Sequence, residues 1–363
     1  MKRIIYVVTV LFLILSPLTG FAENVKESAS KNFAKYGMGY RYNVGGWIYL
    51  HIEGEPYERG YQHGFLLADE IVDVIERWRN VFPQKRSWDL QKKTAMRLFW
   101  NKYPDEYQEE IKGIADGVAD AGGVIDGSPV NHEDILTLNE MYELLSRFRT
   151  YLIHPVRSSL KWLLSNFFKT GFSQTPHMGH CSAFIATGEA TADGGVVASH
   201  STWRANEETW FPTYVTERWN VILDITPSSG YRIMMTTSPG LIWSDEDFYQ
   251  NDAGMILMET TLSPLGAWTK RGDPVVVRVR KAIQYSDNID EIVECLLKNN
   301  NGLMANDWVM GDTKTGEIAS LELALHHHGL RRTKNGFIYS CNNVKDDKVR
   351  WELNSLFGFG VTG

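Results

Sequence analysis

The chain has 363 residues, of which 43% are hydrophobic, and a formal net charge of −7 at pH 7. This composition can build a large buried core, and the length allows one large domain or two modest ones. An acidic chain is a poor nucleic-acid binder, because neutralising phosphates requires clustered Lys and Arg.

The first 22 residues have the layout of a secretory signal peptide. Lys2 and Arg3 precede an apolar run over residues 4–15, and small residues lead to Ala22. The apolar run is too short for a confident membrane span. We therefore expect cleavage after Ala22 and a secreted or periplasmic protein, with a retained anchor as the alternative.

Helical patterns dominate residues 23–150. Residues 46–52 alternate as a strand, but three helical patterns follow at residues 56–75, 104–122 and 131–144. Pro56 opens the first pattern, and Asn131 is a good N-cap for the third. We assign residues 23–150 to a helical N-terminal segment, which would act as a pro-segment.

Residues 151–180 form a distinct linker. A basic, aromatic and amphipathic stretch at residues 158–169 is followed by polar residues at 173–177. This pattern is typical of a processing linker, a flap over a pocket, an interfacial helix with transient membrane-surface contact, or an ordinary packed helix.

Cys181 begins a predicted β-hairpin. Residues 181–187 are apolar and β-branched, residues 193–195 are an Asp-Gly-Gly turn, and residues 197–203 form a second strand-like run. Antiparallel pairing brings the two outer ends together, so we expect His200 and Thr202 near Cys181. A lone cysteine is more often a buried structural residue than a nucleophile, so its neighbours must decide.

From residue 181 onward strands dominate. A helical pattern over residues 274–298 interrupts them, and no closing helix is evident before residue 363. Runs of strands with helices around them predict a layered α+β domain. The predicted strands occupy residues 214–223, 231–236, 255–261, 307–312, 316–325 and 336–339.

Three cysteines do not make a disulfide framework, and an odd number leaves at least one of them outside any disulfide. Cys295 falls in a helical pattern and Cys341 follows a strand-like run. A Cys295–Cys341 bridge and two separate buried thiols both fit the pattern.

Five sequence blocks resemble one family. Residues 179–183, with His200, Thr202 and Trp203 beyond the turn, resemble the phospholipase B-like family. They also resemble the autoproteolytic N-terminal-nucleophile (Ntn) cysteine hydrolases around the isopenicillin N acyltransferases. The likeness spans residues 45–345, and its further blocks lie in the family's order at residues 54–64, 238–249, 253–261 and 301–308.

The resemblance implies a four-layer αββα Ntn sandwich over residues 181–363, preceded by the helical segment. It also implies cleavage between His180 and Cys181, after which the two fragments stay associated. A thiol is a weak nucleophile at neutral pH and needs a base. The α-amine released on Cys181 has a pKa of about 7.7–8.0 and can serve as that base. Family members commonly continue further, so this chain can be C-terminally truncated.

The resemblance also implies roles for individual residues. Asn306 is the expected oxyanion donor, because its amide offers protons without a charge to desolvate. His200 and Thr202 would orient the amine or thiol, although many relatives carry an Arg and an Asp in this strand. Glu259 and Thr261 alternate onto one face of a strand, where Thr261 would bind the amine or substrate and Glu259 would balance charge in the pocket.

The motif blocks suggest an aromatic acyl pocket lined by Trp203, Trp243, Phe248 and Trp308. The acidic residues 245–247 are expected to be a solvated loop.

No cofactor or metal is expected. Three consecutive histidines at residues 326–328 rarely point at one metal ion, and a phosphate-cradling Gly loop, a dinucleotide fingerprint and a Gly-x-Ser-x-Gly elbow are absent.

These observations lead to one hypothesis and two alternatives. We expect a cysteine Ntn hydrolase that cleaves a linear amide, or transfers its acyl group, through a Cys181 thioester. A phospholipase B-like lipid deacylase is the alternative enzyme. A secreted binding protein that keeps the fold but never matures is the alternative from another class.

Overall fold

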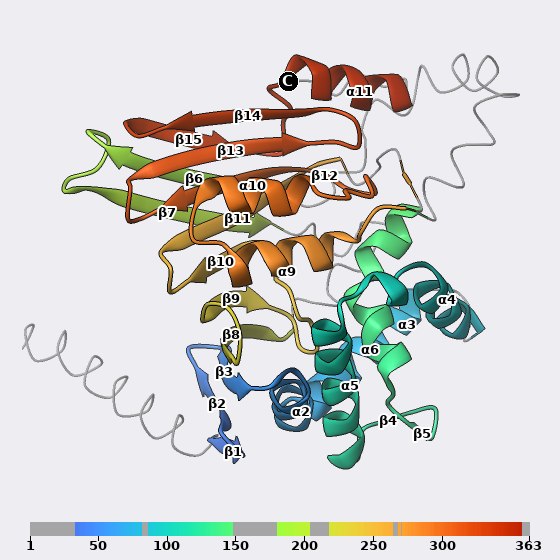
Figure 1. Ribbon diagram of the computed structural model, residues 1–363. Coiled ribbons are helices and arrows are strands. Elements are labelled where there is room, and N and C mark those ends of the chain that lie inside the picture. Colours follow the sequence, from blue (N-terminus) through green and yellow to red (C-terminus); the bar gives the residue numbers. More distant parts are fainter. Residues whose placement is uncertain are drawn as a thin grey trace, which may run out of the picture.

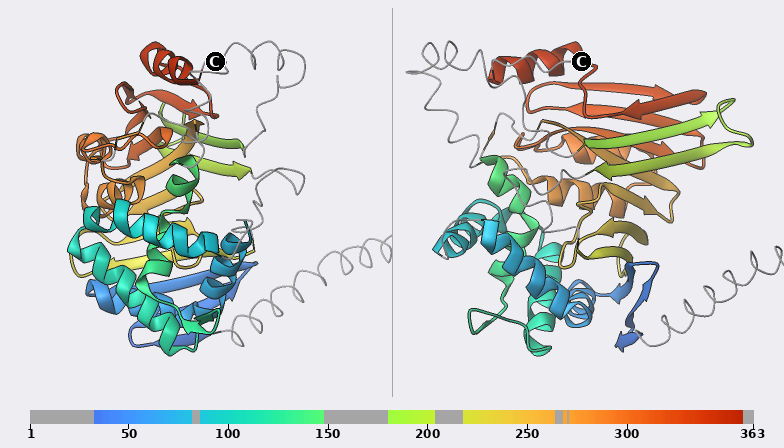
Figure 2. Two further views of the ribbon diagram at one scale, coloured as in Figure 1. Left: turned by 90° about the vertical axis from the view of Figure 1, so that its right-hand side faces the viewer. Right: turned by 180° about the vertical axis from the view of Figure 1, so that it is seen from behind.

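The computed structural model describes residues 33–81, 86–147, 180–203, 218–263, 268–269 and 271–357. Within them, one large sheet carries helices on one face and a smaller sheet on the other (Figures 1 and 2). The predicted signal peptide and the amphipathic residues 158–169 lie outside the described ranges. No helix inside those ranges is both long and apolar enough to cross a bilayer.

The large sheet has ten strands, which include most of the strands predicted from the sequence. Neighbouring strands are antiparallel except for β3 and β8, which pair in parallel. In spatial order the strands are β1 (Ala34–Tyr36), β2 (Gly39–Val44), β3 (Trp47–Gly54), β8 (Asn220–Pro227), β9 (Ile233–Thr237), β10 (Phe248–Asn251), β11 (Met255–Ser263), β12 (Ala305–Asp312), β13 (Glu317–Leu323) and β14 (His328–Thr333).

The N-terminal segment is not purely helical, because it supplies β1, β2 and β3 to this sheet. Only the strand at residues 46–52 was predicted. The parallel pairing of β3 with β8, in which Trp47 lies opposite Asn220, joins the segment directly to the strand-rich part of the chain. A boundary at residue 150 therefore does not divide the described fold into separate bodies of helices and strands.

The N-terminal helices follow the predicted patterns with two differences. The pattern that starts at Pro56 is split between α2 (Pro56–Leu66) and α3 (Ala68–Val81), and the sequence analysis missed α4 (Arg86–Leu98). The other elements are η1 (Trp100–Lys102), α5 (Asp105–Asp120), the short strands β4 (Val124–Ile125) and β5 (Ser128–Pro129), and α6 (His132–Asn139), which the Asn131 side chain caps.

The C-terminal half differs from expectation at two helices. The predicted helix at residues 274–298 is two helices, α9 (Val275–Tyr285) and α10 (Ile289–Leu297), because Asn288 starts a new cap by accepting from Glu291 N. A closing helix, α11 (Asp347–Phe357), follows the last strand and was not predicted.

Two helices meet at glycines. Gly60 and Gly64 of α2 face the backbone of α5, and Gly113 and Gly117 of α5 face the backbone of α2. A Cβ atom on Gly64 would lie 2.0 Å from the Ile114 carbonyl oxygen. The two helix backbones therefore approach more closely than any other residue type at Gly64 would allow.

The smaller sheet consists of β15 (Gly336–Ser340), β6 (His180–Gly188) and β7 (Gly194–Trp203) in that order. It stacks on the large sheet, where Ala183 and Ile185 join Met258, Val309 and Ile318 in a core between the sheets. A view along the sheets separates the helical layer, the large sheet and the smaller sheet (Figure 2). The fold is therefore the predicted α+β arrangement of stacked sheets. A second helical layer over the smaller sheet is not among the described residues.

Candidate active site

The hairpin places Cys181 where the sequence predicted it. Cys181 pairs with Thr202 and Ala183 pairs with His200, so these four residues share the inner face of β6 and β7. The burial alternates accordingly, since Cys181 and Ala183 are buried while Ser182 is exposed. The predicted proximity of His200 and Thr202 to Cys181 is confirmed.

The His200 ring has a defined tautomer. Its Nε2 lies 2.8 Å from the Glu259 carbonyl oxygen, which can only accept, so Nε2 carries the proton and Nδ1 presents a lone pair. Thr202 Oγ1 lies 3.4 Å from Nδ1 but donates its proton to the Glu246 carbonyl. Burial lowers the pKa of His200, which favours the neutral ring. His200 is therefore arranged to accept a proton.

Asp247 also lies beside Cys181, which corrects the expectation of a solvated acidic loop. The Cys181 Sγ, one ring nitrogen of His200 and one carboxylate oxygen of Asp247 all lie within 4.8 Å of one another. Asp247 has a left-handed φ of +62°, and its carbonyl accepts from Glu259 N across the β10–β11 pair. The sequence signal was weak, since neither feature can be read from an Asp-Glu-Asp run.

Helices hold the loop that presents Asp247. The Asn139 side chain of α6 bonds to Gly240 O and Ile242 N, both in the loop between β9 and β10. His63 of α2 accepts from Gly240 N at 3.0 Å. The helical segment thus takes part in shaping the site.

Glu259, Thr261 and Asn306 form a second group beside the first. Thr261 Oγ1 lies 3.4 Å from Glu259 Oε2, as their predicted common face requires. With its amide oriented to satisfy both polar atoms, Asn306 donates to Glu259 Oε1 and to the Ala305 carbonyl, both at 2.9 Å. Burial raises the pKa of Glu259 to about 8, and its carboxyl is also hydrogen bonded to Asp247.

This second group faces the helical side of the large sheet. Trp308 and Met310 of β12 belong to the main core, while Val309 belongs to the core between the sheets. Alternation therefore turns Asn306 toward the helical side, away from the inner face of the hairpin. Asn306 is linked to Cys181 through Glu259 and Asp247.

Asn342 is a site residue that the sequence analysis missed. Cys181 N donates to its Oδ1 at 2.6 Å, and its Nδ2 donates to the Thr261 carbonyl at 2.9 Å. Asn342 has φ of +59°, a left-handed conformation that Asn adopts more readily than most residues. Its position just after β15 gives no sequence signal, because β15 reaches β6 only through tertiary pairing.

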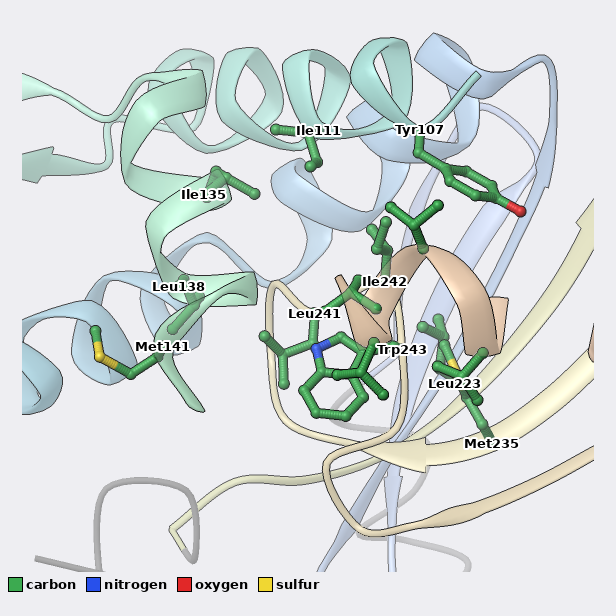
Figure 3. Packing of buried hydrophobic residues seen from close by; sticks show 14 of the residues in the cluster. Tyr107, Ile111, Ile135, Leu138, Met141, Leu223, Met235, Leu241, Ile242 and Trp243 are labelled. Carbon is green, nitrogen blue, oxygen red and sulfur yellow. The ribbon is translucent and has the colours of Figure 1, made fainter. Parts of the chain in front are cut away.

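Of the four aromatic residues predicted to line an acyl pocket, the three whose side chains the structure describes do not come together. Trp243 is buried in the main core (Figure 3), where it packs edge-on against Tyr142. Trp308 belongs to the same core, whereas Phe248 packs against the core between the sheets. Their apolar surface stabilises two separate cores, because adjacent strand positions alternate between faces. The Trp203 side chain and the His180 side chain lie outside the described residues, although both backbones belong to the hairpin.

The remaining candidates lie elsewhere. None of the three cysteines, all in described positions, forms a disulfide, so the Cys295–Cys341 bridge is not present. His327 bonds to Glu352 of α11 rather than gathering with its neighbours. Of the described residues, only Cys181, His200 and Asp247 bring metal-binding side chains together.

A family model described as Phospholipase B matches residues 68–326. The chain belongs to this family. The match confirms the predicted phospholipase B-like relationship, which rested on the blocks around the nucleophile and downstream of it.

The chain is similar to three further proteins, two of which are named phospholipase B or phospholipase B-like. Phospholipase B-like 1 of Homo sapiens is 30% identical over 70% of this chain and 47% of its own length. Phospholipase B of Crotalus adamanteus is 25% identical over 93% of this chain and 66% of its own length. An uncharacterized protein of Archaeoglobus fulgidus is 26% identical over 79% of this chain and 45% of its own length. The chain therefore spans about half to two thirds of the length of the curated relatives it matches.

A conjugated bile acid hydrolase variant from Clostridium perfringens resembles the chain at 9% identity and a TM-score of 0.23. The match covers 50% of this chain and 52% of that one. A score this low does not by itself establish a common fold.

Proposed function

We propose that the chain is a secreted hydrolase that cleaves itself before Cys181 and then attacks a linear amide through a Cys181 thioester. The observation that carries this proposal is the convergence of Cys181, His200 and Asp247 at one end of the hairpin. A thiol beside an oriented, neutral imidazole is the arrangement that activates a cysteine nucleophile. Family membership independently supports a hydrolase.

In the uncut chain, His200 is the proton acceptor. Its Nδ1 takes the Cys181 thiol proton, and Sγ attacks the carbonyl carbon of His180. The C–S bond forms, the C–N bond breaks, and the proton passes to the Cys181 nitrogen. Water then hydrolyses the thioester, which leaves a carboxylate on His180 and a thiol and an α-amine on Cys181. Asn342, which accepts from Cys181 N, orients the nitrogen of the bond to be cut.

In the cut chain, the new α-amine becomes the base. An amine with a pKa of about 7.7–8.0 is partly neutral near pH 7.5 and can take the thiol proton directly. Asn342 Oδ1 can keep its hydrogen bond to this amine, and it carries no negative charge that would raise the pKa of the amine. A neutral anchor therefore suits a basic amine better than a carboxylate would.

Both fragments would stay together after cleavage. The pairing of β3 with β8, and the helical contacts to the loop that carries Asp247, would hold the N-terminal fragment in the fold. Loss of one peptide bond does not expose either of these interfaces.

The proposed substrate is an amide because self-cleavage already requires the same chemistry. Expelling an amine demands that the leaving nitrogen be protonated, and the group that took the thiol proton can donate it: His200 in self-cleavage and the α-amine of Cys181 in turnover. Deacylation of a phospholipid is the second candidate. The family, together with a relative called phospholipase B, favours it.

Intact mass and N-terminal sequencing of the purified protein test self-cleavage. We expect two fragments split between residues 180 and 181, and a single chain in Cys181→Ala. Cys295→Ala, which removes a cysteine of α10, is the matched control and should be cut normally. A wild-type chain that stays uncut, or a Cys181→Ala chain that is still cut at this bond, contradicts the proposal and favours the non-enzymatic alternative.

The cut protein then decides the substrate class. It should release acids from a panel of N-acyl amides, and Cys181→Ala should not. Release of fatty acid from phosphatidylcholine vesicles without cleavage of any amide would replace the proposed substrate with the second candidate.

A further inference from the structure

Three metal-binding side chains meet at the nucleophile from two different sheets. Cys181 lies at the start of β6, His200 near the end of β7, and Asp247 in the loop before β10. Their ligand atoms all lie within 4.8 Å of one another. A thiolate, an imidazole and a carboxylate are the three ligand types that Zn²⁺ takes in proteins.

We propose that Cys181, His200 and Asp247 form a Zn²⁺ site that occupies the nucleophile and holds it inactive. Binding of the metal depends only on these side chains. The regulatory consequence rests on the proposed function, because a blocked thiolate matters only if the thiolate reacts.

The separations suit a tetrahedral ion. Zn²⁺ bonds of about 2.0–2.3 Å place neighbouring ligand atoms about 3.3–3.7 Å apart. The three atoms would therefore move together by about 1 Å or slightly more. Rotation of the partly buried Asp247 side chain can supply much of this shift, whereas the backbones of Cys181 and His200 are fixed by the hairpin pairing.

The His200 ring is already oriented as a ligand. Zinc-bound histidines commonly donate their second ring N–H to a carbonyl or carboxylate, which fixes the tautomer and the ring plane. The Glu259 carbonyl holds Nε2 in this way at 2.8 Å, which leaves Nδ1 as the binding atom.

The charges balance at this site. One thiolate and one carboxylate neutralise the two charges of Zn²⁺, so the complex carries no net charge into a partly buried pocket. Binding replaces the thiol proton, which leaves to solvent, and ties up the lone pairs on Sγ and Nδ1 that the reaction needs. Zn²⁺ would therefore block self-cleavage in the uncut chain and turnover in the cut one.

Cleavage should strengthen the site. In the uncut chain a water fills the fourth position, as in open zinc sites. In the cut chain the Cys181 amine can join Sγ on the same ion, because the N–Cα–Cβ–Sγ unit closes a five-membered chelate ring. Maturation thus adds a ligand without any change of fold.

Titration of the chelator-treated full chain with Co²⁺ tests the site. Co²⁺ reports thiolate ligation through a near-ultraviolet charge-transfer band and tetrahedral geometry through intense visible bands. We expect both bands in the wild type, and their loss on addition of Zn²⁺, which binds such sites more tightly. Cys181→Ser should abolish the charge-transfer band, and His200→Gln and Asp247→Asn should each weaken binding by about tenfold or more.

Controls separate this site from other thiols and imidazoles. Cys295→Ser and Cys341→Ser remove the other two thiols, and His327→Gln removes the imidazole paired with Glu352. All three should bind Co²⁺ like the wild type, and each variant is checked for a normal unfolding transition. A wild type without a thiolate band, or a Cys181→Ser variant that keeps it, overturns the proposal.

The two proposals fail in different ways. Co²⁺ binding through Cys181 in a chain that is never cut leaves the metal site standing and refutes self-cleavage. A chain that is cut and active but shows no thiolate band refutes the metal site alone. If both hold, one equivalent of Zn²⁺ should stop turnover and a chelator should restore it.

Discussion

Two buried glutamates show how differently this fold treats the same side chain. Glu110 of α5 lies between Arg59 and Arg280, with Arg59 Nε at 2.8 Å and Arg280 Nη2 at 3.2 Å from Oε2. Burial alone would raise its pKa, but the two guanidinium groups outweigh burial and hold it below the usual range. Glu259 is equally buried beside Thr261, Asp247 and Asn306, none of which brings a positive charge, and its pKa is raised to about 8.

The contrast distinguishes a carboxyl that stabilises the structure from one that is suited to chemistry. A charge that is buried and paired ties elements together, and here it joins α2, α5 and α9. A buried carboxyl without a cation stays protonated near neutral pH and costs stability once it ionises. Such a group is a feature of functional sites, and Glu259 is hydrogen bonded to Asp247, which lies beside Cys181.

The largest expected difference is in the pH dependence of stability. Glu259 has a folded pKa of about 8 and an unfolded pKa of about 4.3, so the folded state binds one more proton between these values. The free energy of unfolding should therefore fall as the pH rises through this window, by up to about 1.4 kcal/mol per pH unit. We expect the free energy of unfolding of Glu259→Gln not to decrease in this way.

Urea unfolding at about pH 5 and about pH 8 measures the effect. Glu110→Gln is the control, and it should keep the wild-type fall between these two pH values. Because the folded pKa of Glu110 is lowered, its contribution is present above the unfolded pKa and is lost as the pH falls through the folded one. If the free energy of unfolding depends on pH in the same way in the wild type and in Glu259→Gln, the proposed difference between the two glutamates is wrong.

Removing the paired carboxyl should cost the most at a fixed neutral pH. Glu110→Ala leaves Arg59 and Arg280 fully buried around a missing anion, so we expect the free energy of unfolding to drop by about 3–5 kcal/mol. Lys112→Ala breaks an exposed pair with Glu109 on the same helix and should change stability by less than about 0.5 kcal/mol. Equal effects of the two variants would show that burial does not distinguish them.

The opposite pattern is expected beside Glu259. Asn306→Ala should lower turnover of the cut enzyme by less than the roughly 10²–10³-fold cost of losing an oxyanion donor, because its amide protons bond to Glu259 and the Ala305 carbonyl, while the protein stays folded. Asn335→Ala, which removes an amide from an exposed turn near Glu189, is the matched control. A loss of about 10²–10³-fold in Asn306→Ala would mean that Asn306 donates to the oxyanion directly, and unchanged turnover would mean that its bond to Glu259 does not matter for the reaction.

The sequence predicted the parts of the site that depend on local pattern. Strand alternation and the Asp-Gly-Gly turn were enough to bring Cys181, His200 and Thr202 together, because pairing in a hairpin follows from the turn. Alternation also gave the common face of Glu259 and Thr261. It did not reveal which side of the sheet that face belongs to, since this depends on which layer covers each side.

The residues that were missed depend on distant contacts. Asp247 reaches Cys181 because α6 anchors its loop, and Asn342 reaches it because β15 pairs with β6. The prediction of an aromatic pocket differs from the structure for a related reason. Trp243 and Trp308 fill the core under the helices, and their apolar character fits a core as well as it fits a pocket.

The smallest expected effect tests how tightly the helical region is built. Gly64→Ala adds a Cβ that would lie 2.0 Å from the Ile114 carbonyl oxygen, so α2 and α5 must separate. Alanine is otherwise the better helix former, by up to about 1 kcal/mol, and this gain opposes the clash. We expect the clash to win and the free energy of unfolding to drop by about 1–3 kcal/mol, measured by urea titration. Gly195→Ala in the turn of the hairpin is the control, since its Cβ would meet only the Asp193 side chain, at 3.2 Å. If Gly64→Ala is more stable than the wild type, the interface between α2 and α5 can accommodate a Cβ atom without a clash. The close approach of the two helices would then not be what excludes water from the Arg59–Glu110 pair.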